Sequence, residues 1–393
     1  MDPAATLHSP SLNPLPSPRY GRARLWLGIS GVGTLVVLAI LALSLDLPGS
    51  LAAGVGSGLG EQGRLLFLGV LAYAAVQLPF DLFGGYLLPR RHGRAYPSLL
   101  RFLVGLARGV VVQGALLWSI AMTLLLASRV AGAAGLVVGG ILLGYLLLAI
   151  RGGLARLLAD RLEDPAEPGA RGTGIGGIPT SYVGSADEGY TGGFLGVLRP
   201  TRLQLPRRWK EQLRPVVLEL VRRRRLLAVE TGAWRRGRWA ALSFTWLGLL
   251  LAAWLVPAER LGTASGVMGF SLWFTLWSFL GLLVLPKLTQ AGVAAVDARL
   301  RAEGADPSLI EESIRRLDGL QDDEASRPPL VEAIFHPIPS VERRLAGIPS
   351  RLPACWDTAR TAIYLSAAGL GLLGRAVHCN SGRPALWAQL PLE

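Results

Sequence analysis

The chain has 393 residues and a formal net charge of +13 at pH 7. Apolar residue types make up 51% of it and its mean hydropathy is +0.41, which is too apolar for an ordinary soluble protein. Its charged residues gather between apolar blocks, as in integral membrane proteins. No aromatic interleaving or recognised nucleic-acid motif accompanies the positive charge, so we expect no nucleic-acid partner.

A Pro- and Ser-rich stretch opens the chain, and we interpret residues 1–24 as a disordered tail, without a cleavable signal peptide. Six apolar stretches of roughly the 20 residues needed to cross a bilayer follow. They cover residues 26–45, 65–88, 109–128, 130–150, 239–256 and 267–285. Because only Arg129 separates the third from the fourth, those two stretches should form a tight helical hairpin.

Arginines in the polar segments predict the orientation. They precede the first span, lie between the second and third, and follow the fourth, whereas the alternate loops carry few. The positive-inside rule therefore places the N-terminus, the central polar region and the C-terminal region on the cytoplasmic face. The high Gly, Ala and Arg content with few Lys favours a bacterial source, so we expect a multi-pass protein of the inner, or plasma, membrane.

Five segments follow from these assignments. After the tail come a four-helix membrane region at 25–150, a cytoplasmic segment at 151–238, two membrane helices at 239–286 and a cytoplasmic helical region at 287–393. The first cytoplasmic segment should contain a linker, a β-hairpin or small sheet at 180–205, and a helix at 206–225. An apolar run at 361–374 is too short to span, so we expect a buried, re-entrant or interfacial helix.

A dense run of arginines lies before the fifth span. It can serve as a topology signal with internal salt bridges, or as a membrane-surface site that attracts anionic lipid by about 1 kcal/mol per charge. The residues are Arg222, Arg223, Arg224, Arg225, Arg235, Arg236 and Arg238.

The most distinctive string is HPIPSVERRL at residues 336–345. It resembles the HP…ER…L element of membrane zinc metallopeptidases of the HtpX and CAAX prenyl protease type. The order of four spans, a β-hairpin, a helix and two further spans agrees with that family. The resemblance implies a mainly α membrane protein of about six transmembrane helices with a cytoplasmic, zincin-like α+β domain.

Family members hold zinc with HExxH on the helix before the fifth span and with the Glu of ExxxD after the sixth. Here the best-matching window, residues 218–222, keeps Glu219 but has Leu218 and Arg222 at the two His positions. In the second motif Val293 replaces the Glu, while Asp297 is kept. All three ligands are missing, so the resemblance implies a degenerate member without zinc or another cofactor.

The inherited site would also include His336 and Arg343 from the HP string. Because an unpaired buried carboxylate is costly, we expect Glu219 to pair with Arg343 or Arg344. A relocated zinc site built from His336, His378, Cys379 and Cys355 is an alternative, although its spacing matches no zinc pattern.

The favoured function is a non-catalytic binding or regulatory protein in contact with membrane lipids. A peptide or membrane-protein partner would pair with the strand edge at 180–205. The alternatives are an active metalloendopeptidase with atypical ligands and a transporter or channel. The spans hold little intramembrane charge beyond Asp81, which we expect to pair with Arg90 or Arg91.

Overall fold

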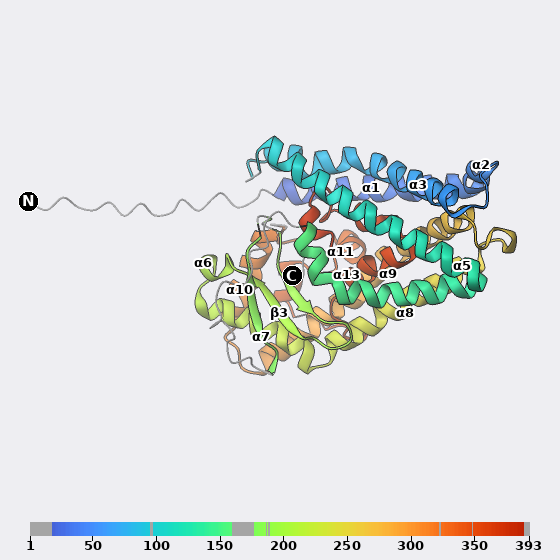
Figure 1. The fold of residues 1–393 in the computed structure, drawn as a ribbon. Helices are drawn as coiled ribbons and strands as arrows, with labels where there is room; N and C mark the ends of the chain where they lie inside the picture. The colour runs from blue at the N-terminus through green and yellow to red at the C-terminus, as the bar shows by residue number, and fades with distance from the viewer. Residues whose placement is uncertain are drawn as a thin grey trace, which may run out of the picture.

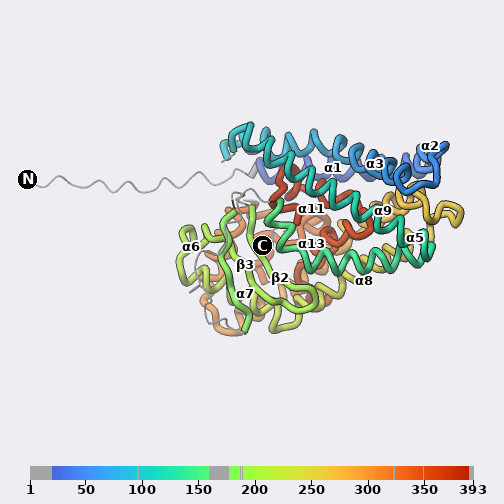
Figure 2. Tube along the Cα trace, in the orientation of Figure 1, coloured from blue at the N-terminus to red at the C-terminus, as the bar shows by residue number. Residues whose placement is uncertain are grey.

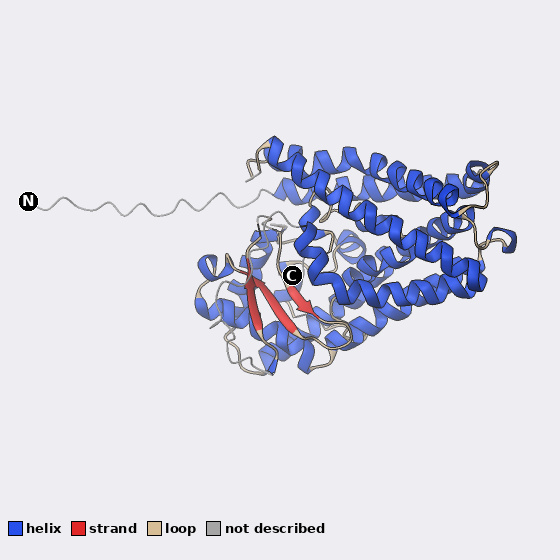
Figure 3. Ribbon diagram, viewed as in Figure 1, coloured by secondary structure: helices blue, strands red, loops and turns tan. Residues whose placement is uncertain are grey.

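The computed structural model describes residues 18–94, 97–158, 177–185, 187, 189–321, 324–347 and 349–388. It is mainly helical, with one small sheet (Figure 3). Most of the predicted tail and of the predicted linker after the fourth span lie outside these residues. Residues 18–24 of the predicted tail are helical, because the first helix begins at Pro18 and continues directly into the first apolar stretch.

Five long helices form a bundle. They are α1 (Pro18–Ser44), α3 (Leu59–Leu82), α5 (Leu99–Leu158), α8 (Ala233–Trp254) and α9 (Ala264–Ala302). A π-helical turn, η1 (Phe83–Leu87), carries α3 on into α4 (Leu88–Arg91). Four segments are long and apolar enough to cross a membrane: Tyr20–Ser44, Leu59–Arg91, Leu99–Leu158 and Ala264–Ala302. The shorter α8, which carries the predicted fifth span, begins with three arginines and is not among them.

The 60-residue α5 is two helices joined by a turn at Ala131 and Gly132. Gly132 has a φ of 57°, which favours glycine, and a Cβ on Gly135 would lie 1.9 Å from the carbonyl oxygen of Ala127. The two halves of α5 therefore fold back on each other, as the sequence predicts beside Arg129.

Loops gather at the two ends of the bundle. At one end lie α2 (Leu47–Ala52) and η3 (Ala258–Arg260); at the other lie the sheet, α6 (Trp209–Gln212) and α10 (Pro307–Gln321) (Figure 1). Arg129 ties the first end together, since its Nε donates to the carbonyl of Gly262 at 3.0 Å and its Nη2 to that of Ser57 at 2.7 Å. The loops with few arginines therefore lie together at one end of the bundle, as the distribution of arginines in the sequence predicts.

The bundle's outer surface is apolar. Large side chains along its helices are about half exposed, among them Val37, Leu41, Val111, Leu142 and Leu250. Such a continuous apolar surface is unfavourable in water and suits hydrocarbon. The fold is therefore that of a membrane protein.

The β-hairpin or small sheet expected at 180–205 is a small mixed sheet of β1 (Thr180–Val183), β2 (Gly193–Leu195) and β3 (Arg202–Pro206). The strand order is β1-β3-β2, with β1 parallel and β2 antiparallel to β3. Only β2 and β3 are joined as a hairpin, because the chain crosses from β1 to the far side of β3 before β2 begins. Local alternation in the sequence cannot distinguish these two arrangements.

Helices next to the sheet share its apolar core. The predicted helix at 206–225 is divided into α6 (Trp209–Gln212) and α7 (Pro215–Glu230), because Leu213 is extended and Pro215 starts a new helix. The predicted helix after Asp306 is α10 (Pro307–Gln321), with Asp306 Oδ1 accepting from the backbone N–H of Ser308 at 2.8 Å. Two short helices, α11 (Pro329–Phe335) and α12 (Val341–Leu345), follow.

The C-terminal segment, residues 355–388, lies inside the helix bundle. It forms α13 (Thr358–Leu365) and the short turns η4 (Ser366–Gly369), η5 (Leu372–Gly374) and η6 (Pro384–Leu386). Figure 2 shows it in red among α5, α8 and α9. Its apolar side chains belong to the same core as those of the membrane helices.

Part of the expected C-terminal region, 287–393, therefore shares the core of the helix bundle. The run at 361–374 is a buried segment that does not span, one of the three alternatives left open by its length. Its entry between α8 and α9 depends on Gly237, where a Cβ would lie 1.9 Å from the carbonyl oxygen of Trp356. The Trp356 N–H donates to the carbonyl of Ala233 at 3.0 Å, and the Tyr364 hydroxyl donates to that of Leu147 at 2.7 Å.

Candidate functional site

The candidate site lies where α7 packs against the C-terminal part of α9, the place at which members of the resembled family hold zinc. The buried face of α7 carries Val217, Val221 and Arg224 at helical spacing. The buried residues of α9 in the same cluster include Val293. Asp297, one turn farther along α9, is 2% exposed.

Asp297 lies between two arginines. Arg224 Nε donates to Oδ1, and Arg344 Nε donates to Oδ2 at 2.9 Å. A second hydrogen bond runs from Arg344 Nη2 to Oδ1 at 3.3 Å. All three side chains are nearly inaccessible to solvent, at 4%, 2% and 4% for Arg224, Asp297 and Arg344. The Arg224 guanidinium also stacks over the Trp356 ring at 5.1 Å. The carboxylate is fully committed to this triad.

A cavity of about 160 Å³ opens beside the triad. Four of its lining side chains are cationic and one is a carboxylate; they are Lys287, Arg301, Arg343, Arg344 and Asp297. Such a lining repels a divalent cation and attracts an anionic group.

These residues do not fit zinc. Zinc takes nitrogen, sulfur or carboxylate donors, whereas a guanidinium offers no lone pair and valine offers no donor atom. Among the residues that the structure describes, no three His, Cys, Asp or Glu side chains come close enough to hold a metal ion. The same finding applies to the alternative zinc site at His336, His378, Cys379 and Cys355. Of these residues, His336 and His378 are neighbours, with ring centroids 5.7 Å apart.

Glu219 lies on the exposed face of α7. Its side chain is 51% exposed, and its carboxylate accepts from Arg222 Nε and Nη2, both at 2.9 Å. This hydrogen bonding raises the pKa of Arg222. The expected pairing of Glu219 with Arg343 or Arg344 is wrong, because the helix turns Glu219 away from α9. Leu218 is only partly buried beside it.

The HP string folds into a compact turn against α9. Gln290 Nε2 donates to the carbonyl of His336 at 2.7 Å and to that of Glu332 at 2.9 Å. The Glu332 carboxylate accepts from Arg343 Nη1 at 3.0 Å and from the backbone N–H of Ser340 at 3.1 Å. These contacts place the next residue, Arg344, against Asp297. Gln290 and Glu332 were missed by sequence reasoning because neither belongs to a recognised motif.

Most of the predicted membrane-surface arginines have internal partners. Arg223 binds Glu230 and Glu303, Arg225 donates to the carbonyl of Thr191, and Arg236 donates to that of Ala354. Arg238 stacks on Trp234 at 4.8 Å and is buried. Arg235 is exposed. The structure therefore favours the alternative of internal salt bridges and hydrogen bonds for this run.

No family model and no curated protein matches the sequence. Among solved structures, the crystal structure of Ste24p from S. mikatae has a similar fold, with a TM-score of 0.63 and 13% sequence identity. The match covers 84% of this chain and 86% of that one. Ste24p is a CAAX prenyl protease, a membrane zinc metalloprotease. The likeness in fold agrees with the family resemblance of residues 336–345.

Proposed function

We propose that this chain is a non-catalytic relative of the membrane zinc metallopeptidases, which acts as a binding or regulatory protein. The sheet, α7, α10 and the N-terminus would face the cytoplasm, and the bundle would cross the inner membrane about six times. The observation that carries the proposal is the engagement of Asp297 by Arg224 and Arg344.

Zinc peptidase chemistry has two requirements that the residues around the triad do not meet. Such enzymes need an open metal position and a metal-bound water near a general base. Here Arg224 lies at the contact between α7 and α9, and Glu219 is exposed on the opposite face of α7. The positive charge of the triad and of the adjoining cavity would raise the energy of any bound cation. The same positive charge would lower the energy of an anionic group of a bound partner.

An extended peptide is the partner that the fold favours. The two outer strands of the sheet, β1 and β2, each pair with β3 on one side only within the described sheet. A free strand edge offers backbone N–H and C=O groups to a peptide in extended conformation. We therefore retain residues 180–205 as the proposed contact for a peptide or a membrane-protein segment.

An active metalloendopeptidase with atypical ligands is the competing hypothesis, and peptide cleavage distinguishes the two. The full chain is reconstituted in liposomes and incubated with fluorogenic peptides, with Ste24p as the positive control. We expect no cleavage above that of empty liposomes. Cleavage that a chelator blocks and added zinc restores would contradict the proposal. The Asp297→Asn variant is assayed in the same way. Cleavage that this variant leaves unchanged comes from a contaminating protease.

A further inference from the structure

A row of charged and small side chains lies along one face of α9 beside the triad. The cavity of about 160 Å³ is lined from this helix by Lys287, Ala291, Ala294, Asp297 and Arg301, among others. These positions are three or four residues apart, so they share one face of the helix. Because the two alanines are small, they leave room between the charged positions. Positive side chains therefore lie at both ends of the cavity's α9 wall.

These two end cations, Lys287 and Arg301, have no carboxylate partner in the part of the chain that the structure describes. Arg301 Nη2 donates to the carbonyl of Arg344 at 2.5 Å, which is a neutral acceptor, and Lys287 is exposed. A third lining cation, Arg343, pairs with Glu332 at 3.0 Å, but its side chain is still 43% exposed and keeps further N–H donors. All three cations are therefore able to bind a ligand that enters the cavity.

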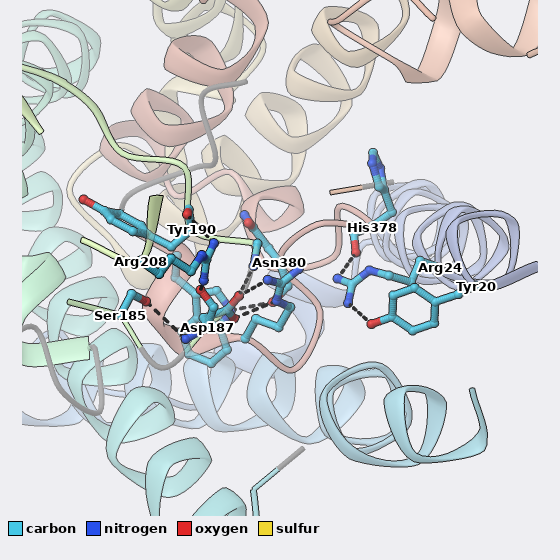
Figure 4. Close-up of polar contacts among 11 residues, drawn as sticks. Tyr20, Arg24, Ser185, Asp187, Tyr190, Arg208, His378 and Asn380 are labelled. Atoms are coloured by element: carbon cyan, nitrogen blue, oxygen red, sulfur yellow. Dashed lines mark hydrogen bonds and ion pairs between the residues drawn. The ribbon is translucent and has the colours of Figure 1, made fainter. Parts of the chain in front are cut away.

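Arginines elsewhere in the chain have the acidic or carbonyl partners that a guanidinium prefers. Arg383 Nε donates to the Asp187 carboxylate at 2.7 Å, and Arg208 Nη1 donates to the carbonyl of Asp187 at 2.9 Å (Figure 4). Arg223 Nη2 pairs with Glu303 at 2.8 Å. A ligand with carboxylate groups would supply the end cations with charge-assisted hydrogen bonds of the same kind.

The remaining lining indicates the shape of such a ligand. Apart from Leu352, the described lining holds no large aliphatic or aromatic side chain, so it does not suit an acyl chain. The Cα atoms of the end cations are about 21 Å apart along the axis of α9, at 1.5 Å per residue. An extended peptide rises about 3.3 Å per residue, so roughly six or seven residues cover that distance. A peptide with acidic side chains along its length therefore reaches both end cations.

We propose that this cavity binds an acidic, extended peptide segment, whose carboxylates contact Lys287, Arg301 and Arg343. The proposal rests on the binding function proposed above and names the chemistry of the partner. Charge complementarity of this kind selects an acidic partner over a neutral or basic one.

Fluorescence anisotropy with the full chain in a non-ionic detergent tests the proposal. The probes are two labelled, amidated heptapeptides in which Thr alternates with Glu or with Gln, and a chelator is present throughout. We expect the Glu peptide to bind at least about tenfold more tightly than the Gln peptide at low salt. Raising the ionic strength should reduce this preference, because salt screens exposed charges.

The Lys287→Gln/Arg301→Gln variant should lose most of the preference for the Glu peptide, since both substitutions remove a cation from the cavity. The matched control is Arg315→Gln/Arg316→Gln. It removes the same charge from exposed positions on α10 that do not line the cavity, and should bind like the wild type.

Equal binding of the two peptides by the wild-type chain, or binding of neither, overturns the proposal without any variant. A variant that fails to fold therefore does not decide the outcome. An unchanged preference in the folded cavity variant also overturns it, as does an equal loss in the α10 control. Mass spectrometry of the recovered peptides, repeated with zinc in place of the chelator, reports on the proposed function separately. Cleaved peptide contradicts the non-catalytic function, whereas intact peptide bound without preference contradicts only the acidic partner.

Discussion

Arg375 lies 294 residues beyond Asp81 in the sequence, and its Nε donates a hydrogen bond to Asp81 Oδ2 at 2.6 Å inside the helix bundle. The two side chains are 1% and 0% exposed. The other carboxylate oxygen of Asp81 accepts from the backbone N–H of Gly382 at 2.7 Å. The expected pairing of Asp81 with Arg90 or Arg91 is therefore wrong, and its actual partners attach the C-terminal segment to α3.

Asp81→Ala should destabilise the chain by about 3–5 kcal/mol, because it leaves the charge of Arg375 buried without its partner. Replacing both residues, as Asp81→Leu/Arg375→Met, should recover much of the loss. Thermal unfolding in detergent measures both changes. Glu311→Ala, which removes an exposed pair with Arg315, is the control and should shift the midpoint little. Equal shifts for Asp81→Ala and Glu311→Ala would show that the buried pair is not formed.

The Arg224–Asp297–Arg344 triad gives a parallel prediction for the contact between α7 and α9. Asp297→Ala should also cost about 3–5 kcal/mol, since two buried guanidinium groups lose their shared carboxylate. The triple variant Arg224→Met/Asp297→Leu/Arg344→Met should be far more stable than Asp297→Ala. Chemical or thermal unfolding of the three proteins provides the comparison. A triple variant no more stable than Asp297→Ala would contradict the predicted source of the loss.

Glu219→Ala should change the stability by less than about 1 kcal/mol, because the pair with Arg222 is an exposed salt bridge. The same variant would remove the general base if the residues 218–222 formed an active zinc site. The unfolding midpoint and the peptide-cleavage assay are measured on the same preparation. A large loss of stability, or loss of a cleavage activity present in the wild type, would refute this placement of Glu219.

Gly237→Ala should displace the C-terminal segment from its entry between α8 and α9, since its new methyl group would meet the Trp356 carbonyl. Cys355, which precedes Trp356 and is 5% exposed, should then react faster with a maleimide. Gly269→Ala in α9 is the matched control, because no atom lies within 4 Å of the added Cβ. Identical thiol labelling in the two variants would show that the segment does not need Gly237.

The membrane helices could be predicted from the sequence because their signal is local. Apolar runs of span length mark α1, α3, α5 and α9, and Arg129 marks the turn inside α5. Asp306 followed by Pro307 likewise predicts the start of α10. In each case the residues that decide the structure are neighbours in the chain.

The ion pairs could not be predicted because their partners are distant in sequence. Asp81 meets Arg375, and Asp297 meets Arg224 and Arg344, through contacts that only the packed helices create. The predicted pairing of Glu219 was wrong because the position that best matches the motif lies on the exposed face of α7, away from the contact with α9. The fold of 355–388 was only partly predicted, because a short apolar run is equally compatible with several buried or interfacial positions.

The central claim is that α7, α9 and the HP string cannot hold zinc, because Val293 offers no donor and two arginines occupy the carboxylate of Asp297. The most direct test is the metal content of the purified full chain after equilibration with zinc and removal of free metal. We expect well under one zinc ion per chain, with no difference between the wild type and Asp297→Asn. A zinc ion bound stoichiometrically by the wild type and lost in Asp297→Asn would contradict the claim.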